Sequence, residues 1–196
     1  DVEVATDVAF TNLVVTTNVL TNSYALSGLS DGTNYFWRVL PKNSGCQGNY
    51  STISRFTTGQ VSCNNYSSTD VPKIISASGT PTVESVLTVP VLSNQIINKV
   101  TVTMTITHTW VADLNVSLVS PSPFNTIIPL FSAQCGSQDN VSATFDDNGN
   151  TLVCTGAIPA ITGLVKPMGL LSNLNGQNPS GTWKLVVADT AGGDGG

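Results

Sequence analysis

Charged side chains are scarce in this sequence, and histidine occurs once. Charged residues make up 10% of the chain, and seven lysines and arginines stand against twelve aspartates and glutamates, for a net charge of −5. A nucleic-acid-binding protein needs a basic stripe, which this composition does not provide, so nucleic acid is excluded as a partner. The single histidine excludes zinc catalysis that depends on several histidine ligands.

Long apolar runs and the common catalytic motifs are also absent. No stretch of about 18 apolar residues occurs, so no transmembrane helix is expected. The sequence has no Gly-x-Ser-x-Gly nucleophile elbow and no glycine-rich phosphate loop. We therefore predict that the chain itself is not an enzyme.

The sequence favours β-structure. Apolar residues show no helical period over three turns anywhere, whereas alternation with a period of two is widespread. Between residues 100 and 110 apolar and aromatic side chains alternate with threonines, and the alternation resumes at 114–118 after a turn. We predict that these two segments pair as antiparallel strands, with His108 and Trp110 facing inward, and that the fold is all-β. An inward His108 is expected to be a hydrogen-bonded core residue and not a catalytic base.

A polar, turn-rich stretch at residues 59–70 has the composition of a connector. It divides the chain into a first domain at residues 1–58 and a second at residues 71–196. Strands are expected in the first domain at residues 2–5, 13–17, 23–26, 34–40 and 50–57.

The segment 29–39 contains the pattern Leu-x-x-Gly-Thr-x-Tyr, in which Gly32 and Tyr35 are the turn glycine and the tyrosine. This pattern resembles the late strands of a fibronectin type III domain. Residues 2–10 resemble the third strand of that family, which implies a partial domain without its first two strands. The resemblance implies a spacer or an adhesion module, with Tyr35, Phe36 and Trp37 used for packing.

Three ordered motifs in the second domain resemble a P domain, also called P/Homo B, which is a β-jelly-roll module. They are His-Thr-Trp followed by Asp-Leu at 108–114, Asn-Pro-Ser-Gly-Thr-Trp at 178–183, and Ala-Asp-Thr-Ala-Gly-Gly at 188–193. Ala112 stands where the family usually has glycine before the aspartate. The family usually continues into one more strand, so we expect the domain to be truncated at its C-terminus.

The two resemblances together imply a setting. A chain that combines these two domains is similar to secreted or cell-surface multidomain proteins of Bacteroidota. Those proteins carry a protease upstream and a sorting domain for type IX secretion downstream. We expect a non-catalytic accessory region that docks on or stabilises a neighbouring domain of the same longer chain, with a metalloprotease or serine protease as the parent protein. The alternative is an adhesion or interaction module without protease activity. Secretion machinery and other surface proteins are further expected partners.

Aspartates in predicted turns are candidate ligands for calcium, which takes six to eight oxygen atoms from flexible loops. P domains are known to hold calcium, so the resemblance implies at least one site. Asp146 and Asp147 belong to a stretch at 146–150 that we predict to be an oxygen-rich loop. The candidate ligands are Asp113, Asp139, Asp146, Asp147, Asp189 and Asp194. The alternative is that these are ordinary turn residues.

Four cysteines in a chain rich in threonine, serine and asparagine indicate an oxidising, extracytoplasmic setting. Cys135 and Cys154 flank a predicted strand and are expected to form a disulfide. Cys46 and Cys63 are separated by an extended strand, so we expect that they do not pair with each other. They would pair outside residues 1–196 or remain free thiols.

Overall fold

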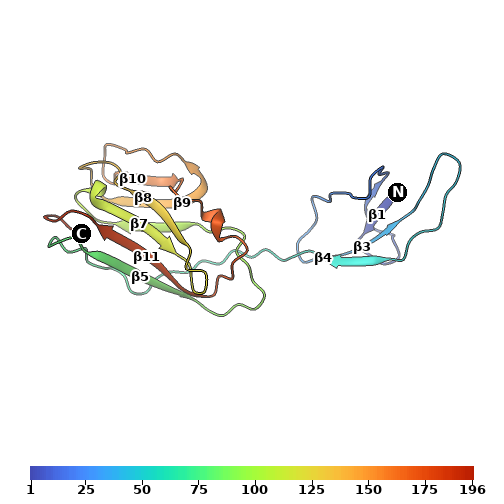
Figure 1. The fold of residues 1–196 in the computed structure, drawn as a ribbon, viewed down its shortest axis with the longest axis horizontal. Coiled ribbons are helices and arrows are strands. Elements are labelled where there is room, and N and C mark those ends of the chain that lie inside the picture. The colour runs from blue at the N-terminus through green and yellow to red at the C-terminus, as the bar shows by residue number, and fades with distance from the viewer. The chain divides into compact units, whose positions relative to one another are not determined.

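A computed structural model describes all 196 residues and confirms an all-β fold. The chain forms two compact units, Asp1–Asn65 and Tyr66–Gly196, which are described separately (Figure 1). The boundary lies within the stretch 59–70 that was predicted as a connector. Eleven strands are joined by loops and two short 3₁₀ helices, neither of which has the length or apolarity of a membrane span.

The first unit contains one antiparallel sheet with the order β2-β1-β3-β4. Its strands are β1 (Val2–Ala5), β2 (Leu13–Thr17), β3 (Asn34–Val39) and β4 (Ser54–Thr57). The strand predicted at residues 23–26 is not formed, and the one predicted at 50–57 is confined to its second half. The sequence pattern at residues 23–26 did not lead to a strand, because the segment has no partner strand for its backbone hydrogen bonds.

Tyr35 is the centre of packing in the first unit. Its side chain is buried and its ring stacks on Phe56, with 5.5 Å between ring centroids. The phenol oxygen accepts a hydrogen bond from the backbone N–H of Ser30 at 2.9 Å. Phe36 is half-buried, whereas Trp37 lies at the rim. The packing role predicted for this aromatic run therefore holds most fully for Tyr35.

The second unit is a sandwich of two sheets. The larger sheet has the order β5-β11-β7-β8, and the smaller has the order β10-β9-β6, in which β10 runs parallel to β9. The strands are β5 (Thr82–Val89), β6 (Val102–Ile106), β7 (Leu114–Val119), β8 (Ile127–Ser132), β9 (Val141–Asn150), β10 (Ile161–Val165) and β11 (Gly181–Asp189). The 3₁₀ helices are η1 (Val111–Asp113) and η2 (Leu171–Leu174).

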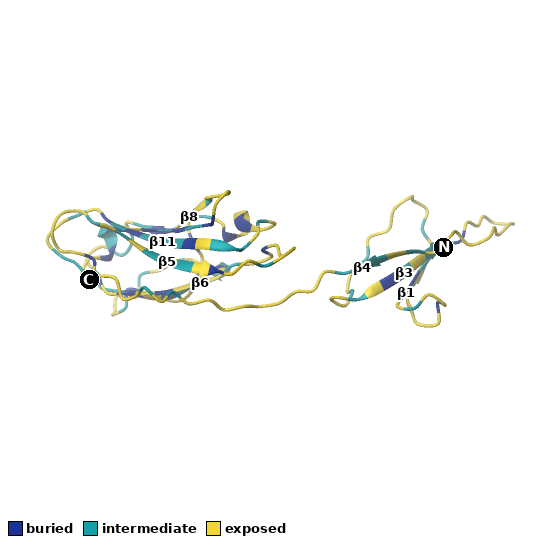
Figure 2. Ribbon diagram, turned by 90° about the horizontal axis from the view of Figure 1, so that it is seen from below, coloured by how far each residue is buried: buried dark blue, intermediate teal, exposed yellow.

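The core of the second unit lies between the two sheets, where the strands bear buried residues (Figure 2). Phe131 of β8 and Phe145 of β9 stack across this space, with ring centroids 6.0 Å apart. Both rings are fully buried. Because one ring comes from each sheet, the contact joins the two layers.

The pairing predicted for residues 100–110 with 114–118 is wrong. Strand β6 pairs with β9 in the smaller sheet, whereas β7 pairs with β11 and β8 in the larger one. The segment between them crosses the sandwich, anchored by Val111 and Leu114, which are fully buried. Trp110 is also not inward: β6 ends at Ile106, and the indole is 48% exposed.

The loop predicted at residues 146–150 is instead the second half of β9. Asn150 accepts a hydrogen bond from the backbone N–H of Lys166 at 2.7 Å, so this half is held by the chain that follows β10. Gly149 packs directly against the backbone of Val165, where a Cβ atom would overlap. The strand was missed because this stretch is polar and becomes a strand only by pairing with a segment that is distant in the sequence.

The predicted disulfide between Cys135 and Cys154 is present. It joins the segment after β8 to the segment after β9. Cys46 and Cys63 are free and exposed, and they are not paired with each other.

Candidate functional site

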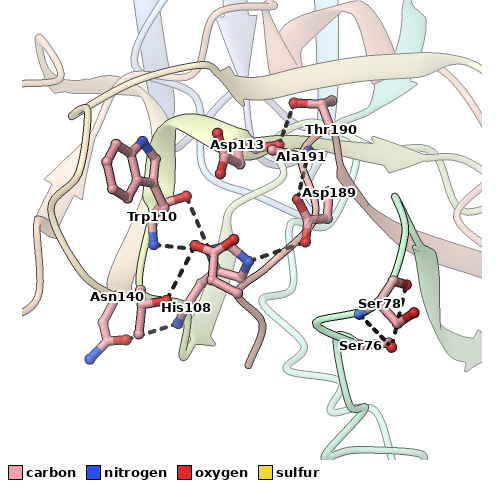
Figure 3. Close-up of polar contacts among 11 residues, drawn as sticks. Ser76, Ser78, His108, Trp110, Asp113, Asn140, Asp189, Thr190 and Ala191 are labelled. Atoms are coloured by element: carbon pink, nitrogen blue, oxygen red, sulfur yellow. Dashed lines mark hydrogen bonds and ion pairs between the residues drawn. The ribbon is translucent and has the colours of Figure 1, made fainter.

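The six aspartates predicted as calcium ligands do not form one site. Asp189 and Asp194 lie within 4.8 Å of His108, measured between possible ligand atoms. Asp113 reaches this cluster through its backbone. Asp146 and Asp147 lie on β9, where other partners occupy them. The cluster of His108, Asp189 and Asp194 is therefore the candidate site (Figure 3).

His108 is the centre of the cluster and is completely buried. Its Nε2 atom lies 3.3 Å from Oδ2 of Asp189, and its Nδ1 atom lies 4.0 Å from Oδ2 of Asp194. The backbone N–H of Trp110 donates to Nδ1 at 3.1 Å. The carbonyl oxygen of Trp110 lies 3.0 Å from the same Nδ1, so Nδ1 faces both backbone groups of Trp110 while Nε2 faces the carboxylate of Asp189.

Backbone contacts fix the position of His108 between two segments. Its N–H donates to Oδ1 of Asn140 at 2.9 Å, and its carbonyl oxygen accepts from the N–H of Asn140 at the same distance. Asn140 has a positive φ of 66°, a conformation that asparagine tolerates better than most residues. The turn before β9 is thereby tied to the segment that follows β6.

The two carboxylates come from the end of β11 and the loop after it. Asp189 is buried, and its Oδ1 accepts the backbone N–H of Ala191 at 3.1 Å. Asp194 is half-buried and accepts the hydroxyl of Thr109 at 3.2 Å. The cluster thus connects the C-terminal end of β11 with the segment that crosses between the sheets.

Asp113 joins this region through its carbonyl group and not through its carboxylate. Its carbonyl oxygen accepts hydrogen bonds from both the N–H and the hydroxyl of Thr190, each at 2.8 Å (Figure 3). Asp139 has a similar backbone role, because its carbonyl accepts the N–H of Ala160 at 2.8 Å. The side chain of Asp139 makes no hydrogen bond or ion pair.

Asp146 is paired with a cation from the chain itself. The Nζ atom of Lys99 lies 2.6 Å from Oδ2 of Asp146, and the N–H of Asn148 donates to Oδ1 at 2.9 Å. Lys99 and this amide hold the pKa of Asp146 below its usual value. The lysine ammonium therefore occupies the place at this buried carboxylate that a metal ion would need.

Asp147 caps the start of η2. Its two carboxylate oxygens accept the backbone N–H groups of Leu171 and Ser172, each at 2.8 Å. Burial opposes ionisation of Asp147, but these two amide bonds outweigh it and hold the pKa below the usual value. Asp146 and Asp147 line a common pocket, yet both carboxylates are already satisfied.

A test of the donor atoms shows which residues fit calcium. Calcium requires six to eight oxygen ligands. The candidate site supplies the carboxylates of Asp189 and Asp194 and, beside Nδ1 of His108, the carbonyl of Trp110 at 3.0 Å. These are at most five oxygen atoms, fewer than calcium requires, and both carboxylate oxygens of Asp189 already have partners in His108 and Ala191. The imidazole suits transition metals. A calcium ion here would be held by the oxygen atoms, with His108 as a neighbour.

Sequence reasoning did not predict that His108 and the two aspartates meet. It placed His108 inward and Asp189 and Asp194 in a glycine-rich loop, but 81 positions separate His108 from Asp189. No local pattern reports a contact over that separation. Lys99 was also missed as the partner of Asp146, and no signal in the sequence pointed to it.

Comparison with known proteins gives one match. Residues 97–196 match the family model described as Proprotein convertase P-domain. The matched range includes His108, Asp189 and Asp194 and every strand from β6 to β11. No curated protein and no solved structure matches the chain.

Proposed function

The chain belongs to the proprotein convertase P-domain family, and from that membership we propose that it stabilises a neighbouring catalytic domain of a longer, secreted protein. A P domain is an accessory, non-catalytic domain. The observation that carries the proposal is the family match over residues 97–196, and the complete burial of the single histidine agrees with a domain that is not itself catalytic.

The second unit has the properties of a rigid accessory body. A disulfide and the His108 cluster tie its loops to its strands. The disulfide also supports a secreted or cell-surface location, since such bonds persist in oxidising compartments. An origin in Bacteroidota and export by type IX secretion are also proposed, and they rest only on the resemblance of the two domains to such proteins.

The first unit would act as a spacer beside the P domain. Its sheet order of β2-β1-β3-β4 supports the resemblance to a fibronectin type III domain, because the third strand of such a sandwich shares a sheet with the last two strands. The contact between Tyr35 and Ser30, five residues upstream, is also typical of a tyrosine at the corner of a β-sandwich.

The experiment that tests the accessory role uses the longer protein that contains this chain. We expect removal of residues 66–196 to lower the thermal midpoint of the neighbouring domain by about 5 °C or more. Deletion of residues 1–58 is the matched control and should change the midpoint little. A neighbour whose midpoint is unchanged, together with binding of the isolated chain to a surface glycan or protein, would favour the adhesion alternative.

Calcium would stiffen the domain at the oxygen atoms of Asp189 and Asp194. If calcium binds the folded state alone, a hundredfold excess over Kd adds about 2.7 kcal/mol to the free energy of unfolding. We expect the thermal midpoint to rise with calcium and to fall with a chelator in the wild type and in Asp139→Asn. Asp194→Asn should abolish the difference. Equal midpoints with calcium and chelator in the wild type would rule out this site.

A further inference from the structure

Strand β5 forms one outer edge of the larger sheet, and two side chains cover the free backbone groups of Val86 near its middle. The N–H of Val86 donates to Oδ2 of Asp70 at 3.0 Å. The hydroxyl of Ser68 lies 2.8 Å from the carbonyl oxygen of Val86 and 2.5 Å from Oδ1 of Asp70, and its one proton is shared between these two acceptors. Since β5 pairs with β11 on its other side, both groups of Val86 point outward. Ser68 and Asp70 thus take the place of a neighbouring strand, and we name them the clasp.

Further contacts hold the clasp in position. The hydroxyl of Ser85 donates to Oδ1 of Asp70 at 2.7 Å, and Nζ of Lys73 lies 3.2 Å from Oδ2. The hydroxyl of Ser68 and the amide of Val86 hold the pKa of Asp70 well below its usual value. The carboxylate is therefore ionised at neutral pH, where it is the stronger form of acceptor.

The opposite edge of the same sheet is closed in a different way. The N–H groups of Met168 and Gly169 donate to the carbonyls of Leu130 and Pro129 on β8, at 3.0 and 2.8 Å. Pro129 also removes one donor from that strand. A backbone segment therefore covers β8, whereas the middle of β5 depends on two side chains.

We propose that the clasp prevents β5 from pairing with the β5 strand of a second copy of this chain. The strand is eight residues long, and Val86 lies next to its midpoint. Two identical strands that pair antiparallel about a two-fold axis present the same groups to each other, so the edge is complementary to itself. Exposed edges of this kind associate unless they are covered, and the clasp covers the central groups.

The first test measures the clasp itself by amide hydrogen exchange in the full chain. Asp70→Ala should increase the exchange rate of the Val86 amide at least tenfold. The amides of Ser85 and Leu87 face β11 and should keep their rates, because neighbouring residues of a strand point to opposite sides. An unchanged Val86 rate, or a general increase along β5, would overturn the proposal.

The second test measures association by sedimentation. We expect Asp70→Ala to self-associate at least tenfold more tightly than the wild type. The double variant Asp70→Ala/Val86→Pro should return to wild-type behaviour, because proline removes the outward N–H and is tolerated on an edge strand. Asp139→Ala is the matched control for the lost charge and should behave as the wild type.

Two outcomes would overturn the proposal here. One is a folded Asp70→Ala variant that associates no more than the wild type, and the other is association that Val86→Pro does not reverse. Should Asp70→Ala fail to fold, Asp70→Leu keeps a branched side chain of similar size, accepts no hydrogen bond and is read in the same two measurements. These two measurements use the chain alone. Their results would therefore be the same if the chain did not stabilise a neighbouring domain.

Discussion

His108 connects distant parts of the second unit. One ring nitrogen lies against the backbone of Trp110, and the other lies against the buried carboxylate of Asp189. A buried carboxylate that loses its partner retains its desolvation cost and gains nothing in return. The stability of this end of the sandwich therefore depends on the ring more than on any single apolar contact.

We expect His108→Ala to lower the free energy of unfolding by about 3 kcal/mol, from the cavity and from the unpaired Asp189. Urea unfolding near pH 7 measures this change. Asp189→Asn should cost less, since an amide can still form a hydrogen bond with Nε2. The double variant should lose less than the sum of the two single changes. Additive losses would show that the ring and the carboxylate do not act together.

The sequence predicted some strands of this fold and missed part of β9. Strands β1 and β2 were predicted with their observed bounds, because both are rich in β-branched residues and are followed by turn-forming residues. The second half of β9 was missed, because Asp146 to Asn150 contain no apolar alternation and pair through backbone contacts with a distant segment. The pairing of β6 was predicted wrongly for a related reason: alternation reports a buried face but not the sheet to which a strand belongs.

The same limit applies to the candidate site. Asp189 and Asp194 could be singled out by their glycine-rich surroundings, and His108 by its place in an alternating strand. Their meeting depends on the packing of two sheets, which no local pattern contains. The pairing of Asp146 with Lys99 depends on the same packing.

The disulfide connects two elements, so its removal tests how far they depend on each other. Cys135 and Cys154 are 19 positions apart, and closure of a loop of that size stabilises by about 3 kcal/mol in the chain-entropy model. We expect Cys135→Ser/Cys154→Ser to lower the thermal midpoint by about 10 °C. The matched control is Cys46→Ser/Cys63→Ser, which removes two exposed free thiols and should leave the midpoint unchanged. Equal midpoints in the two double variants would contradict a stabilising role.

At the scale of the whole molecule, ionised carboxylates link stability to pH. Three aspartates of the second unit have pKa values below the usual one: Asp70 through the Ser68 hydroxyl, Asp146 through Lys99, and Asp147 through two amides that outweigh its burial. A group of this kind binds its proton more readily in the unfolded chain. Its stabilising effect is therefore complete above the unfolded pKa of 3.8 and is lost as the pH falls through the folded value.

We therefore expect the thermal midpoint to be nearly constant from pH 7 to about pH 5 and to fall steadily below about pH 4. The clasp, the Lys99 pair and the cap of η2 would weaken over one common range, because all three depend on carboxylates with lowered pKa values. Asp147→Asn should start from a lower midpoint and fall less steeply, since it has one such carboxylate fewer. A midpoint that stays level to pH 2.5 in the wild type would show that these carboxylates contribute nothing to folding.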